Sequence, residues 1–156
     1  MNKVKSLIFF GLITASTFAQ STYFLVFSWD NGRIEFKEIE SVNVSVKHRT
    51  PKYISDQFLY VELSQDGRPV YWTAIHDPRK VHAEFPNPDG TLSRQDAILL
   101  SADFFIRVPA NFDADKIRFL KPSPGRRQRL ELDVPLSEQT VLYTIGEIPI
   151  NLTAKP

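Results

Sequence analysis

Short stretches in which apolar side chains take every second position recur along most of this chain, and this period of two is typical of half-buried β-strands. Residues 23–29 place four large apolar side chains on one side of such a strand, namely Tyr23, Leu25, Phe27 and Trp29. Asp30-Asn31-Gly32 follows, and Asn-Gly is the pair that best fits the two left-handed positions of a type I′ turn. Ile34 and Phe36 continue the alternation, so the pattern predicts a β-hairpin of fixed register.

Further stretches of the same kind follow, with turn residues between them. Gln65-Asp66-Gly67-Arg68-Pro69 separates two of them and predicts a second hairpin, because Gly supplies positive φ and Pro cannot donate to a central ladder. Residues 91–100 fit either a short helix or a buried strand, which periodicity cannot separate over so few positions. The remaining strand-like stretches cover residues 42–46, 58–63, 70–75, 81–85, 104–108, 117–119, 130–134, 141–145 and 148–152.

About nine short strands at near-regular spacing predict an all-β fold rather than a parallel α/β sheet. The expected architecture is a single antiparallel β-sandwich over residues 20–156, similar to immunoglobulin and fibronectin domains in strand number and spacing. A jelly roll is the main structural alternative. No sequence motif accompanies this similarity, so it assigns no role to any residue.

The first nineteen residues are predicted to be a cleaved secretory signal peptide. Lys3 and Lys5 provide a basic start, residues 7–13 are apolar, and Thr17-Phe18-Ala19 favours cleavage before Gln20. An uncleaved anchor over residues 7–29 is the alternative, since no charged residue occurs there. The polar residues that follow Ala19 and the strand-like residues 23–29 favour cleavage. The mature protein is therefore expected to be periplasmic or secreted, without a stable transmembrane span.

The charge and cysteine content exclude several classes of protein. The chain has 19 Lys and Arg residues and 18 Asp and Glu residues, and two of the lysines belong to the leader. Its mature part is thus nearly neutral, which argues against a nucleic-acid partner. The chain has no cysteine, so it has neither a lipoprotein acyl site nor a disulfide framework.

A basic cluster flanks the turn predicted near residues 122–125. One interpretation is an anion-binding edge for a protein partner or an envelope glycan or lipid. The interpretation that the sequence favours is a solvated hairpin on which Arg129, Glu131 and Asp133 face Lys116 and Arg118 across the strands. The cluster consists of Lys116, Arg118, Lys121, Arg126, Arg127 and Arg129.

Metal ligands are a second hypothesis. His76, His82 and Glu84 lie close in sequence, but they match no known ligand spacing, and a solvated strand face is favoured. Residues 87–90 and 113–115 offer oxygen ligands suited to calcium. Asx residues in turns usually bond their own backbone instead, so no metal and no cofactor is predicted.

Catalytic motifs are absent from the sequence: it has no Gly-x-Ser-x-Gly elbow and no cysteine, and His48 precedes a predicted turn. No catalytic residue is therefore assigned. Sugar stacking on aromatic side chains is a further hypothesis, but Trp29 and Trp72 share their strand faces with apolar residues and are expected in the core.

The function that the sequence favours is an exported, non-enzymatic binding or interaction module of the bacterial envelope or extracellular space. Its contacts are expected at end loops, at the basic hairpin, or at free sheet edges that add a partner strand. The alternative is a secreted carbohydrate-binding or glycan-hydrolysing domain.

Overall fold

The computed structural model describes residues 21–44, 50–124 and 128–154. The predicted leader, His48, Arg126 and Arg127 lie outside the described residues. Almost all regular structure in these ranges is β-strand, which confirms the predicted all-β class. The elements are β1 (Thr22–Asp30), β2 (Arg33–Val42), β3 (Tyr53–Ile54), β4 (Phe58–Gln65), β5 (Arg68–His76), β6 (Lys80–Pro86), β7 (Leu92–Ile98), β8 (Ser101–Pro109), β9 (Ala114–Pro122), β10 (Gln128–Arg129), the 3₁₀ turn η1 (Leu136–Glu138) and β11 (Leu142–Leu152).

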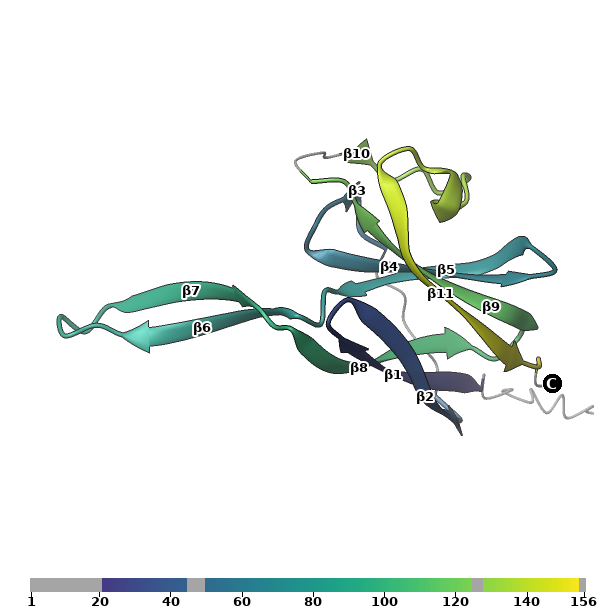
Figure 1. The fold of residues 1–156 in the computed structure, drawn as a ribbon, viewed down its shortest axis with the longest axis horizontal. Coiled ribbons are helices and arrows are strands. Elements are labelled where there is room, and N and C mark those ends of the chain that lie inside the picture. Colours follow the sequence, from purple (N-terminus) through teal and green to yellow (C-terminus); the bar gives the residue numbers. More distant parts are fainter. Residues whose placement is uncertain (1–20, 45–49, 125–127, 155–156) are drawn as a thin grey trace, which may run out of the picture.

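Seven of these strands form two sheets that face each other as a sandwich, called here the body (Figure 1). One sheet has the strand order β2-β1-β8, and the other has the order β11-β9-β4-β5. All their pairings are antiparallel, as the hairpin pattern predicts. No helix in the described ranges is long and apolar enough to cross a membrane.

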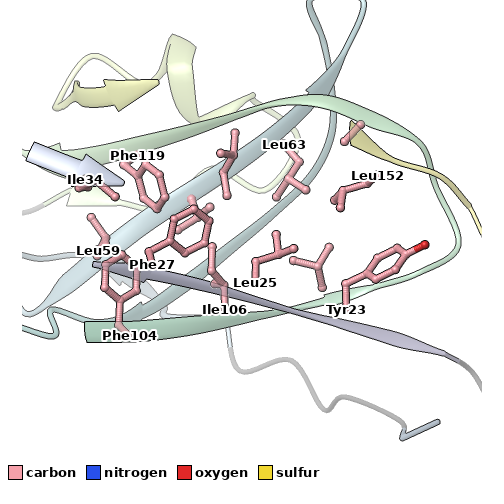
Figure 2. Close-up of a cluster of buried hydrophobic side chains, with 14 of the residues drawn as sticks. Tyr23, Leu25, Phe27, Ile34, Leu59, Leu63, Phe104, Ile106, Phe119 and Leu152 are labelled. Atoms are coloured by element: carbon pink, nitrogen blue, oxygen red, sulfur yellow. The ribbon is translucent and has the colours of Figure 1, made fainter. Parts of the chain in front are cut away.

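The main core lies between the two sheets. Because neighbouring side chains on a strand point to opposite faces, every second residue of β1 enters this core. Figure 2 shows Phe27 of β1 among side chains from both sheets. Its ring centroid lies 5.5 Å from that of Phe104 on β8 and 5.1 Å from that of Phe119 on β9. Trp29 is also buried, as predicted.

Both predicted hairpins are present, and each closes on two residues with positive φ. The φ angles are 47° at Asn31 and 87° at Gly32 in the turn between β1 and β2. They are 51° at Asp66 and 75° at Gly67 in the turn between β4 and β5. Positive φ at both central positions is the type I′ geometry, whose twist matches that of the flanking strands.

A second apolar cluster covers the outer face of the four-stranded sheet. Tyr60 on β4 and Leu120 on β9 are buried there beneath Ile54 of β3 and Leu136 of η1. Strand β4 is therefore enclosed on both faces, which explains why its sequence reads as a nearly continuous apolar stretch. Trp72 of β5 is partly buried against the same cluster, so it belongs to neither an open platform nor the main core.

Four predicted strands differ from the structure. Residue 42 is the last of β2, which continues directly from the first hairpin, and Val44 is exposed beyond it. Only Gln128–Arg129 is strand near residues 130–134, because that segment turns back through Val134 N–H donating to Glu131 O. The final two stretches form the single strand β11, whose register shifts after Thr144 and Pro149 absorb the extra residues.

Residues 91–100 contain a strand, β7, which is exposed along its whole length rather than buried. Among the described residues β7 pairs only with β6, and together they form a hairpin that projects from the body, at the far left in Figure 1. This hairpin, residues 80–98, is called the arm below. Side chains 81–86 and 91–98 of the arm are all exposed.

Candidate functional site

The basic cluster predicted from the sequence is dispersed over two sheets. Lys116, Arg118 and Lys121 lie on β9, which pairs with β4 and β11. Arg129 lies on β10, which pairs with β3 instead. The predicted hairpin between these segments is therefore not formed. The prediction that Arg129 lies opposite Lys116 and Arg118 on paired strands is wrong.

Two cations of β9 are neutralised by carboxylates on the strands beside it. The Arg118 guanidinium lies 3.0 Å from Glu62 Oε1 on β4 and 3.0 Å from Glu147 Oε2 on β11. Lys116 Nζ lies 2.9 Å from Glu147 Oε1. Glu62 is only 1% exposed, and its second oxygen accepts a hydrogen bond from the backbone N–H of Ser137 in η1. These contacts hold the sheet and η1 together.

The network at Glu147 makes part of the stability depend on pH. A hydrogen bond from Lys116, followed by one from Arg118, holds the pKa of the Glu147 carboxyl below its ordinary value of 4.5. A lowered folded-state pKa means that the stabilisation is complete above pH 4.5 and disappears as the pH falls through the folded value. Glu147 is well exposed, so we expect less than about 1 kcal/mol.

Glu147→Gln is therefore expected to lower the thermal midpoint at pH 7. As acid is added, the midpoint of the variant is expected to approach that of the unmodified protein. Thermal melts of both proteins at a series of pH values from 7 to below 4.5 test this. A midpoint difference that stays constant over this range would contradict the ion-pair assignment.

Lys121 belongs to the base of the arm rather than to an open anion site. Its Nζ lies 2.7 Å from Asp77 Oδ2, and the two side chains are 12% and 2% exposed. The same Nζ donates to the backbone carbonyls of Asp56 and Phe58. Asp77 Oδ1 accepts the backbone N–H of Arg79 at 3.0 Å. The residues just before β6 are thus fixed to β9.

Further contacts set the direction of the arm. The Arg79 guanidinium stacks on the Trp29 ring with its carbon 3.6 Å from the ring centroid, a cation–π arrangement. Lys80 Nζ lies 2.7 Å from Asp56 Oδ2, and this contact lowers the pKa of the Asp56 carboxyl. Leu99 N–H donates to Arg79 O, and Leu100 O accepts Asn31 N–H from the first turn. The contacts of Arg79, Lys80, Leu99 and Leu100 just described, together with the Asp77–Lys121 pair, are called the arm anchor.

The two faces of the arm differ in chemistry. Directly paired residues of antiparallel strands share a face, so the register of β6 and β7 assigns each side chain. One face, the neutral face, has no ionisable side chain and consists of Val81, Ala83, Phe85, Ser93, Gln95 and Ala97. The other, the charged face, consists of Lys80, His82, Glu84, Pro86, Leu92, Arg94, Asp96 and Ile98.

The residues considered for metal binding are occupied by other contacts. His82 Nδ1 lies 2.7 Å from Asp96 Oδ1 on the charged face, and hydrogen bonds from Arg94 and then His82 lower the pKa of the Asp96 carboxyl. His76 stacks on Phe58 in the body, with ring centroids 4.9 Å apart. Within the described ranges, no three His, Asp or Glu side chains are placed to hold a metal ion.

The two calcium hypotheses are replaced by turn and loop contacts. At the tip of the arm, Asp89 Oδ1 accepts the backbone N–H of Thr91 at 2.9 Å and its hydroxyl at 2.6 Å. Asp113 accepts the backbone N–H of Ala154, and Asp115 accepts that of Asp66. Asp89 therefore bonds the backbone of its own turn, as the sequence favoured, whereas Asp113 and Asp115 bond backbone that is remote in sequence.

Two of the surface hollows of the body bear on the predicted basic cluster and on sugar stacking. Arg129 lines one of about 550 Å³ together with Lys52, Glu131 and Asp133. The other, of about 320 Å³, lies on the outer face of the three-stranded sheet beside Phe24 and Phe105. Both are shallow, and neither contains a tryptophan on which a sugar ring could stack.

Sequence reasoning identified strand β6 but left residues 91–100 open between a helix and a buried strand, and it did not identify the arm. Alternation at residues 81–85 predicts one buried face. The only sequence signal that this face is exposed is that no amphipathic segment nearby could cover it. The arm anchor was also missed, because Lys121 and Asp77 are 44 residues apart. Searches against protein-family models, curated proteins and solved structures give no significant match to this chain.

Proposed function

We propose that the protein is an exported, non-enzymatic binding module of the bacterial envelope or extracellular space, and that the arm is its contact element. The observation that carries this proposal is the uncovered neutral face of a hairpin whose base is held rigidly. A two-stranded hairpin is only marginally stable alone in water and gains stability when an apolar face is covered. The arm therefore has the character of an interaction surface.

The arm anchor supports the proposal because a hairpin held in a fixed direction is better prepared for binding than a free one. Immobilising a loose segment during association costs free energy, and a segment already fixed avoids that cost. Asp77 and Lys121 are largely desolvated, and Arg79 covers the buried Trp29 ring. These contacts restrict the start of β6, while Leu99 restricts the end of β7.

A non-enzymatic role is supported by how the buried ionisable groups are used. Glu62 and Asp77 both accept hydrogen bonds from a cation and from a backbone N–H. A carboxylate held by such structural partners is not placed to exchange protons with a substrate.

The immunoglobulin-like architecture and the exported location belong to the same proposal. Lettered A to G in chain order, the seven body strands divide into β1, β2 and β8 against β4, β9 and β11, with β5 joining the second group. Constant-type immunoglobulin domains place A, B, E and D in one sheet and C, F and G in the other, so six of the seven strands agree and support the proposed similarity, while β5 lies in the opposite sheet. Export and a periplasmic or secreted location rest on the leader sequence at residues 1–19.

The proposal is tested by placing a photoreactive phenylalanine analogue at position 85, on the neutral face. Irradiation of cells that make the protein is expected to give a discrete, heavier covalent product, which denaturing gels and mass spectrometry measure. Phe85 is 49% exposed, so this substitution leaves the core intact.

The matched control carries the same analogue at Glu84, the neighbouring residue on the charged face. We expect the position-85 product to exceed the position-84 product several-fold. Equal yields at both positions, or no product at either, would contradict the assignment of the arm as the contact element.

A further inference from the structure

We propose that the neutral face of the arm binds the neutral face of a second copy of this chain, so that two arms pack face to face in opposite directions. This inference rests on the proposed function, because it names the partner of the same contact element. Three properties of the arm support it: the distribution of charge, the order of side-chain sizes, and the apolar area at its base.

The charge distribution favours a like partner. The neutral face has no ionisable group, so a charged partner would lose its hydration there without gaining an ion pair. A second neutral face loses no hydrated charge. The charged faces of both arms then point outward, where the Asp96 carboxylate keeps its contacts with His82 and Arg94 in water.

The order of side-chain sizes favours antiparallel packing. Phe85 and Ser93 form the level nearest the tip, Ala83 and Gln95 form the middle level, and Val81 and Ala97 form the level nearest the body. When one arm is reversed against the other about a two-fold axis that runs across the strands between the two faces, β6 lies over β6, and each Phe85 ring meets the smaller apolar side chain of Val81 of the second copy. The middle levels meet on the two-fold axis, as an isologous interface requires.

The base of the arm adds apolar area where the tip of the second arm would arrive. Leu99 and Leu100 follow β7 directly, and Leu100 is 76% exposed. The six side chains of the neutral face and two leucines still bury less than the roughly 800 Å² per partner of a standard interface. We therefore expect a reversible dimer with a dissociation constant on the order of micromolar.

The test uses the fact that the chain has no cysteine, so that one introduced thiol is the only one present. Facing sheets lie about 10 Å apart, beyond the reach of a disulfide, and a short bis-maleimide is therefore the suitable cross-linker. Ala83→Cys places the thiol beside the two-fold axis. His82→Cys, one residue away on the charged face, is the matched control.

We expect the Ala83→Cys protein to form a covalent dimer at least about tenfold faster than the His82→Cys protein, because pairing raises the effective concentration of the second thiol. Adding Phe85→Asp to Ala83→Cys is expected to abolish this advantage. Sedimentation of the unmodified chain is expected to show a dimer fraction that rises with protein concentration through the micromolar range. The single substitution Phe85→Asp is expected to remove this dimer fraction. An unchanged thermal midpoint of each variant shows that the fold is retained.

Equal cross-linking rates for the two thiols would overturn the second-copy inference, and so would a purely monomeric unmodified chain over this range. The photoreactive analogue at position 85 then separates the two proposals. A cross-linked product whose added mass differs from the mass of one copy of this chain would refute self-association. It would still support the arm as the contact element. No product at all would refute both.

Discussion

Lys121→Ala is expected to lower the free energy of unfolding by about 3–5 kcal/mol, because it removes the hydrogen-bonded cation of a buried carboxylate, whose other cation, Arg79, lies 3.8 Å away. Asp77 is 2% exposed, and Lys121 Nζ at 2.7 Å is its charged hydrogen-bond partner on β9. The same substitution removes the donor to the backbone carbonyls of Asp56 and Phe58. Urea denaturation of the purified variant measures the loss.

Lys116→Ala is the matched control, since it removes the same side chain from the same strand. Lys116 is 38% exposed and its partner Glu147 is 40% exposed, so we expect a loss of less than about 1 kcal/mol. Amide hydrogen exchange at Leu99 is expected to accelerate in the Lys121 variant, because its N–H donates to Arg79 O within the arm anchor. Equal losses for the two variants would contradict the role of Lys121.

Phe27→Ala is expected to cost about 3–5 kcal/mol, as do other truncations of buried phenylalanine. The Phe27 ring contacts Phe104 in its own sheet and Phe119 in the facing sheet, so the resulting cavity opens at the boundary between the layers (Figure 2). Chemical denaturation is again the measurement, with a shift of the midpoint at unchanged slope.

Phe105→Ala provides the corresponding surface control. Phe105 is on β8, the strand that carries Phe104, but it is 47% exposed on the outer face of the sheet. It stacks on Phe24 with ring centroids 5.5 Å apart, and such pairs contribute about 0.5–1.5 kcal/mol. A Phe105 variant as unstable as the Phe27 variant would place the principal core on the wrong side of this sheet.

The local structure was predictable wherever neighbouring residues determine it. Asn31-Gly32 and Asp66-Gly67 close the two hairpins because their backbone angles are decided within the turn. The alternation that ends at Trp29 correctly identified the buried face of β1, since that strand is covered by the facing sheet. The two hairpin turns and the buried face of β1 therefore follow from period and turn chemistry.

Tertiary partners were not predictable by the same reasoning. Residues 81–85 alternate as residues 23–29 do, yet no layer of residues 21–44, 50–124 or 128–154 covers them, because burial depends on what the rest of the chain brings near. The cations of β9 looked like one basic patch because their carboxylate partners are remote in sequence. Arg118 and Glu62 are 56 residues apart, and only the pairing of β9 with β4 brings them together.

The arm also leaves the body and returns to it at one point, because Lys80 and Ile98 are directly paired. Both large sheets keep all their own pairings outside this segment. Insertions are tolerated best where the two ends of the inserted chain lie close together and cross no other contact. The junction of Lys80 and Ile98 is thus a natural grafting position, at which hairpins of other sequence can be displayed on this disulfide-free scaffold.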